Sequence, residues 1–292
     1  ATADRPNFLF ILADDQSPFD FRFYDPSSPL RAPAIERLAR EGIVLETVVH
    51  MGSFMGAVCT PSRHMIMTGR TLWRLPISPI VPPACPPGIE TNTLPAVFRA
   101  AGYATMRTCK TGNSYEGANR QFEIRRDATK RGSSDDEGSA WHAEQVRQFL
   151  DERQRTHDRR PFFIYLGFSH PHDPREGKPD LLAHYGAVNA NDPAEVPQPG
   201  PATPPLPPNW LPQHPFPHGH EDVRDEVAVS GVKRDRSPRV IRNEIGRQFA
   251  CVENMDLQIA RIREWLENTG EWPNTYVVYT ADNGISIGRH GL

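Results

Sequence analysis

Four short, mostly apolar runs divide the chain and predict strands that are buried on both faces. They cover residues 7–13, 103–109, 162–168 and 275–280. Between them, apolar residues recur at three- and four-residue steps, which is the spacing of one helix face. Strands that alternate with helices indicate an α/β fold, with a mostly parallel central sheet flanked by helices on both faces.

Helices are predicted at residues 33–40, 93–101, 139–150 and 238–268. The last of these carries an apolar stripe that we interpret as core packing. Ser139 is expected to cap the helix that follows it. The charged stretch 125–138 predicts a surface loop, and the proline-rich stretch 193–220 predicts an extended surface excursion.

Polar residues follow each predicted strand at its carboxyl end, and in a parallel sheet these ends meet at one edge. The residues concerned are Asp14, Asp15, Lys110, His170, His172, Asp282 and Asn283. Two adjacent carboxylates repel each other unless a cation joins them. Hard oxygen ligands suit Ca²⁺, with Mg²⁺ as the alternative. The sequence therefore predicts a cation site, with histidine available for acid–base work.

Each of these features also has a purely structural interpretation. The two aspartates would then form a solvated turn, Lys110 would be a surface lysine, and Asp282-Asn283-Gly284 would be an ordinary turn. The clustered His214, His218 and His220 favour a solvated loop, although one of them could line the pocket.

Cys59 lies at a predicted helix start, because Pro61 suits the first turn of a helix. Unpaired N–H groups and the helix dipole at such a start attract an anion. Arg63, one turn further on, could add a bidentate clamp on an oxyanion. The alternative is an inert, buried structural cysteine.

The composition argues against a nucleic-acid-binding, a membrane-spanning and a disulfide-rich protein. The chain has 292 residues, 38% of them hydrophobic, and a net charge of −3, which gives no basic field for nucleic acid. No run approaches the length of a membrane span. Its four cysteines are too few for a disulfide scaffold and match no zinc spacing, and a disulfide between Cys85 and Cys109 stays open.

The run Cys59-Thr60-Pro61-Ser62-Arg63 resembles the C-x-P-S-R signature of type I sulfatases, which share the alkaline phosphatase-like fold. The resemblance extends over residues 7–292. It implies that Cys59 is oxidised to formylglycine (3-oxoalanine) by a formylglycine-generating or anaerobic sulfatase-maturing enzyme. It also implies calcium ligands, which are Asp14, Asp15, Asp282, Asn283 and the modified Cys59.

The same resemblance implies a mechanism for sulfate ester hydrolysis. The hydrated aldehyde attacks sulfur, Arg63 stabilises the formylglycine, Lys110 contacts sulfate, and His172 acts on the leaving-group side. Aldehyde re-formation then expels sulfate. The implied substrate is a sulfated glycan or sulfated small molecule. Together with the N-terminal Ala1-Thr2-Ala3, which fits a mature end left by signal-peptide removal, this implies a periplasmic or extracellular location.

The chain departs from the family pattern in two ways. Gly112 stands where a histidine is usual, and Asn113 is a possible substitute. The chain also ends before a second active-site lysine, so residues 1–292 are expected to be a sulfatase N-terminal catalytic domain without its smaller C-terminal subdomain. Further substrate-binding candidates are His170, His220 and His290.

Two other functions compete with sulfate ester hydrolysis. One is a phosphonate monoester or phosphodiester hydrolase on the same scaffold. The other is a catalytically impaired protein that binds a sulfated ligand, a hypothesis motivated by the missing histidine and lysine.

Overall fold

A parallel sheet of five strands forms the centre of the computed structural model, which describes residues 5–53, 58–75, 88–128, 138–213 and 235–291. The strands lie in the order β3-β2-β4-β1-β5, and every neighbouring pair is parallel. Their bounds are β1 Asn7–Ala13, β2 Ala104–Lys110, β3 Ile124–Ala128, β4 Phe162–Gly167 and β5 Thr275–Ala281. The predicted fold class is confirmed.

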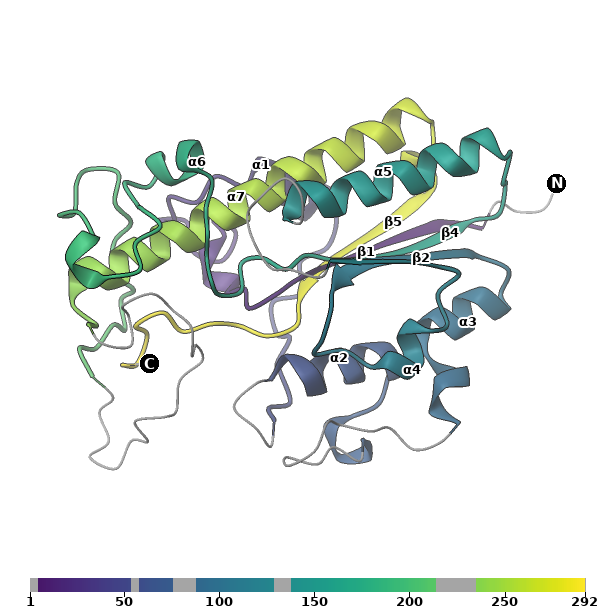
Figure 1. The fold of residues 1–292 in the computed structure, drawn as a ribbon, viewed down its shortest axis with the longest axis horizontal. Helices are drawn as coiled ribbons and strands as arrows, with labels where there is room; N and C mark the ends of the chain where they lie inside the picture. Colours follow the sequence, from purple (N-terminus) through teal and green to yellow (C-terminus); the bar gives the residue numbers. More distant parts are fainter. Residues whose placement is uncertain (1–4, 54–57, 76–87, 129–137, 214–234, 292) are drawn as a thin grey trace.

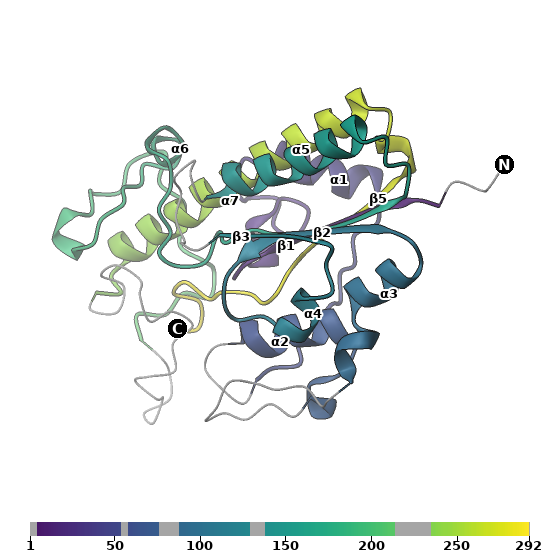
Figure 2. The same ribbon diagram turned by 45° about the vertical axis from the view of Figure 1, so that its right-hand side comes forward.

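Helices cover both faces of the sheet (Figures 1 and 2). One face carries α1 (Pro33–Glu41), α5 (Ser139–Arg155) and α7 (Pro238–Asn268), and α6 (Pro179–Ala183) packs beside α7. The other face carries α2 (Cys59–Thr68), α3 (Leu94–Ala100) and α4 (Glu116–Asn119). Short 3₁₀ helices lie at Pro18–Asp20, Leu72–Arg74, Ile89–Asn92, Pro193–Glu195 and Trp272–Asn274.

The pleat of β1 divides the core into two layers, because successive side chains of a strand point to opposite faces. Leu9 and Ile11 belong to the larger cluster, which includes residues of α5 and α7. Leu12 belongs to the smaller cluster, which includes Met67 of α2. Among the described residues, no helix is long and apolar enough to cross a membrane.

Three local predictions are wrong. Residues 125–128 belong to strand β3, not to a surface loop, and their charges are paired, as in the contact of Arg107 Nε with Asp127 Oδ1 at 2.8 Å. Ser139 does not cap α5; Gly138 is the N-cap residue, and the Ser139 hydroxyl contacts His170. Strand β5 is an edge strand that exposes Tyr276 and Val278, so it is not buried on both faces.

The start of α1 is capped by a residue from another helix. Ala32, its N-cap residue, has no polar side-chain atom, and Asp256 of α7 accepts the N–H groups of Ala34 at 3.1 Å and Ile35 at 2.8 Å. Because Asp256 is buried, these two bonds fix α1 against α7.

We expect Asp256→Ala to lower the free energy of unfolding by about 1–3 kcal/mol, since it leaves two helix N–H donors without their partner. Chemical denaturation measures the change. Asp151→Ala on the exposed side of α5 is the control, and there a loss below about 0.5 kcal/mol is expected. Equal losses in the two variants would contradict the capping role.

Candidate functional site

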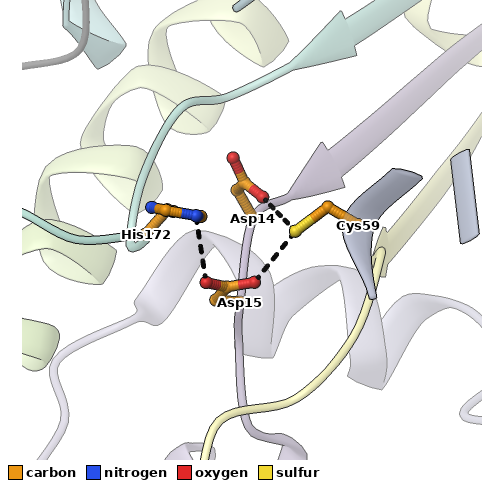
Figure 3. Close-up of side chains that lie close together, drawn as sticks. All are labelled: Asp14, Asp15, Cys59 and His172. Atoms are coloured by element: carbon orange, nitrogen blue, oxygen red, sulfur yellow. Dashed lines mark hydrogen bonds and ion pairs between the residues drawn. The ribbon is translucent and has the colours of Figure 1, made fainter. Parts of the chain in front are cut away.

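The predicted strand-end residues converge at the carboxyl edge of the sheet. Asp14 and Asp15 follow β1, and Lys110 is the last residue of β2. Cys59 is the first residue of α2, as the sequence predicts for a helix start. Figure 3 shows the side chains of Asp14, Asp15, Cys59 and His172 pointing toward one another. One ligand atom from each of these four lies within 4.8 Å of the others.

The Cys59 thiol faces carboxylates. Its Sγ lies 3.5 Å from Asp14 Oδ1 and 3.4 Å from Asp15 Oδ1, and the side chain is buried. Burial, followed by the charges of Asp14, Asp282 and Asp15, raises the pKa of the thiol far above its usual value. Because the thiolate is the nucleophilic form of cysteine, this site does not activate an unmodified Cys59.

Arg63 joins carboxylates from two strand ends. Its Nη2 lies 3.3 Å from Asp14 Oδ1, and its Nε donates to Asp282 Oδ2 at 2.8 Å. A third contact runs from Nη1 to Cys109 Sγ at 3.1 Å, and the guanidinium is fully buried. The sequence suggests an oxyanion clamp at Arg63, whereas in the structure this guanidinium holds the acidic residues themselves.

Lys110 is a buried partner of Asp14 rather than a surface lysine. Its Nζ forms an ion pair with Asp14 Oδ2, and the residue is 1% exposed. Burial raises the pKa of Asp14, but Lys110, Arg63 and His172 together hold it well below its usual value. Asp14 is therefore the carboxylate of this cluster that stays ionised.

The neighbouring carboxyl groups ionise less readily. Burial and the charge of Asp14 raise the pKa of Asp282 to about 7, against the opposing effect of Arg63. Burial and Asp14 also raise the pKa of Asp15. Like charges held this close favour a bound cation, since it would let all three groups ionise.

The donor set fits a hard divalent cation. Asp14, Asp15 and Asp282 supply carboxylate oxygens, and Asn283 adds an amide that contacts Asp15 Oδ1 through Nδ2 at 2.7 Å. Its buried Oδ1 has no hydrogen-bond partner among the described residues. An unpartnered amide oxygen beside carboxylates is a ligand that Ca²⁺ accepts.

His172 presents one ring nitrogen to the cluster. Its Nδ1 donates to the Asp173 carbonyl at 2.7 Å, which leaves Nε2 at 3.4 Å from Asp15 Oδ2. Burial lowers the pKa of His172, but Asp173, Asp14 and Asp15 outweigh it and raise the pKa above its usual value. A proton at Nε2 is therefore favoured.

The remaining candidates lie around the cluster or apart from it. Asn113 accepts from Thr60 Oγ1 at 3.4 Å and so lies beside the first turn of α2. The His170 ring contacts Ser139 instead of the cluster, and His290 contacts Asn209 Nδ2 at 2.8 Å. His220 and Cys85 lie outside the described residues, and Cys109 is a buried free thiol.

Two buried polar residues of the helices lie close to the site but are not marked by any sequence pattern. His142 of α5 contacts Thr108 Oγ1 at 2.8 Å and Ser169 Oγ at 3.4 Å. Gln248 of α7 contacts the backbone of Asp15. Both residues lie within predicted helices, and the spacing of apolar residues along a helix does not predict which polar side chains make buried contacts.

Neutral His142 should make the protein sensitive to acid. Burial, followed by the charges of His170 and Arg107, lowers the pKa of His142 from 6.5 to about 3. The unfolded chain therefore binds a proton that the folded protein excludes, and stability is lost as the pH falls from about 6.5 toward 3. We expect His142→Gln to flatten the free energy of unfolding between pH 6.5 and 4. His142→Phe should flatten this pH dependence equally. If both variants kept the wild-type slope of unfolding free energy against pH, His142 would not be the source of the acid sensitivity.

Comparison with known proteins adds family context. The sulfatase family profile matches residues 6–292. Human iduronate 2-sulfatase is 24% identical over 351 aligned positions, which cover 100% of this chain and 57% of that protein. The multifunctional alkaline phosphatase superfamily protein PehA of Trinickia caryophylli is 29% identical over 153 positions, covering 49% of this chain and 28% of PehA.

A solved structure supports the same fold. The phosphonate monoester hydrolase of Agrobacterium radiobacter superimposes with a TM-score of 0.70 at 16% identity, covering 99% of this chain and 64% of that chain. In each of these comparisons the chain spans less than two thirds of the matched protein.

Proposed function

Because the chain belongs to the sulfatase family, we propose that it hydrolyses sulfuric esters at the cluster around Cys59. The observation that carries the proposal is the convergence of Asp14, Asp15, Cys59 and His172 at one sheet edge. Buried Arg63 and Lys110 lie against the same acidic residues. Such a site combines cations for an anionic ester with a position for a nucleophile and a proton donor.

We propose that Asp14, Asp15, Asp282 and Asn283 hold Ca²⁺, together with the group at position 59. A bound calcium ion would neutralise the carboxylates and lower the pKa of a neighbouring hydroxyl. A formylglycine made from Cys59 would supply the nucleophile that the protonated thiol does not. The maturing enzyme is then a required partner of this chain.

The side chains of the cluster have separable roles in this proposal. Arg63 fixes Asp14 and Asp282 at one spacing, because its fully buried guanidinium pairs with both. Lys110 adds positive charge that can meet the sulfate. His172 holds a proton at Nε2 and can deliver it to the leaving alcohol. Asn113, beside Thr60, is the proposed substitute for the histidine usual at position 112.

We infer a sulfated carbohydrate as the substrate class, since one relative that aligns with the whole chain is named for iduronate. Such substrates fit a periplasmic or extracellular site of action. Residues 1–292 form the N-terminal catalytic α/β region in this proposal. Residues 193–213 of the proline-rich stretch are a surface excursion in it, and residues 214–220 lie outside the described residues.

The test compares matched chromogenic esters. Protein co-expressed with a maturing enzyme should hydrolyse 4-nitrophenyl sulfate with a higher kcat/KM than 4-nitrophenyl phosphate or a phenylphosphonate monoester. Mass spectrometry of the Cys59 peptide should detect formylglycine. Preference for the phosphonate would overturn the proposal in favour of the alternative activity, for which the Agrobacterium enzyme is named. Ligand binding without turnover by formylglycine-containing protein would instead favour the binding function.

A further inference from the structure

We propose that Gln248 of α7 is a positioning residue that holds the loop carrying Asp15 and the loop carrying His172 in register. The expected effect of Gln248 on catalysis rests on the proposed function, whereas its contacts with the two loops are independent of that function. Gln248 itself lies outside the cluster of Asp14, Asp15, Cys59 and His172, and it reaches the cluster only through the backbone carbonyl of Asp15.

Gln248 bridges the two loops through both ends of its amide. Its Oε1 accepts from Arg175 Nε at 2.8 Å, three residues beyond His172. Its Nε2 donates to Asp20 Oδ2 at 3.1 Å and to the Asp15 carbonyl at 3.4 Å. Arginine only donates and a carboxylate only accepts, so the partners fix the orientation of the amide. Gln248 is 1% exposed, so its amide is satisfied mainly by these protein partners.

The Arg175 side of the bridge is itself anchored to α7. Arg247 Nε donates to the Arg175 carbonyl at 2.7 Å, and Arg247 Nη1 lies 2.7 Å from Glu244 Oε1. Arg175 Nη1 lies 3.8 Å from the other oxygen of Glu244. Positions 244, 247 and 248 share one helix face at three- and four-residue spacing. One face of α7 therefore holds the His172 loop through several bonds, and Gln248 extends this hold to Asp15.

The Gln248 bridge is important because the contact between His172 and Asp15 is too long to fix the two loops by itself. His172 Nε2 and Asp15 Oδ2 are 3.4 Å apart and belong to different loops. Small shifts of either loop change how the His172 ring and the Asp15 carboxylate face each other. Side chains that orient the groups of a metal or catalytic centre typically contribute about 10–100-fold in affinity or activity.

The test replaces Gln248 by glutamate, which keeps the size and the Arg175 bond but cannot donate to Asp15 or Asp20. Gln258→Glu is the matched control. Gln258 is also buried on α7, donates to Asn254 Oδ1 at 3.2 Å and accepts from Arg261 at 3.1 Å, all within the helix. Relative to this control, Gln248→Glu should exchange amide hydrogens faster in both residues 14–20 and residues 170–177. It should lower kcat about 10–100-fold with KM changed less than about threefold.

A second change makes the result specific. In Gln248→Glu/Asp20→Asn the donor and acceptor are exchanged between positions 248 and 20, whereas the bond to the Asp15 carbonyl stays absent, so only part of the loss in kcat should be recovered. If Gln248→Glu does not fold, Gln248→Met replaces it with the same expected hydrogen exchange. Identical exchange and kcat in the position-248 and position-258 variants would overturn the inference. A wild-type protein that cleaves no sulfate ester would overturn the proposed function instead, while the exchange experiment still tests the bridge.

Discussion

We expect Cys59→Ala to lose at least about 10⁴-fold in kcat/KM on a sulfate ester, since removal of an enzymatic nucleophile costs this much or more. Alanine keeps Cβ and the helix start, so the neighbouring contacts of Asp14 and Asp15 remain possible. Thermal unfolding should shift little, because the thiol contributes only a small buried volume. The measurement is single-substrate kinetics on protein co-expressed with a maturing enzyme.

Cys251→Ala is the matched control for this variant. Cys251 is likewise a buried free cysteine, but it lies in the middle of α7. Its loss should leave kcat/KM within about threefold of wild type. Retained activity in Cys59→Ala would contradict the assigned nucleophile. The activity of protein whose residue 59 is entirely cysteine can be compared with that of protein whose residue 59 is entirely formylglycine. Equal activity of the two would contradict the need for the modification.

The sequence predicted the strands that carry the site because each is a short, mostly apolar run, although β5 proved to be an exposed edge strand. For β1 the predicted and observed bounds are the same, and for α7 they also agree. Each strand end is marked by a change from apolar to charged residues, so Asp14, Lys110 and His172 could be assigned to one edge. Their convergence then followed from the parallel topology alone.

Contacts that depend on packing between distant segments could not be predicted in this way. Strand β3 was missed because its charged residues are typical of a solvated loop, whereas in the fold Asp127 pairs with Arg125 and with buried Arg107. The orientation of the Arg63 side chain toward Asp282 could not be predicted either, since it depends on how α2 lies relative to the end of β5. Asp256 and Gln248 lie on α7 and bind segments that are distant in the sequence, so no local pattern of residues indicates their contacts.

We expect Asp14→Asn to abolish measurable Ca²⁺ binding and to lower kcat/KM by about 10³-fold, because Asp14 is the carboxylate of the cluster that stays ionised. Calorimetry of the metal-free protein measures the first effect. Treatment of wild type with a chelator should reproduce the loss of activity reversibly. Asp127→Asn is the control: this carboxylate also pairs with a buried arginine, on the neighbouring strand, and its loss should spare Ca²⁺ binding.

The same substitution has a second, separable consequence. Without Asp14 the buried Lys110 ammonium loses its ion-pair partner, and breaking a buried pair costs about 3–5 kcal/mol. Asp14→Asn/Lys110→Met removes both charges, so it should recover most of the stability while Ca²⁺ binding stays absent. If the double variant binds Ca²⁺ like wild type, Asp14 serves only as the counter-ion of Lys110 and is not a metal ligand. Recovery of stability without Ca²⁺ binding assigns Asp14 both functions, one in the fold and one in the metal site.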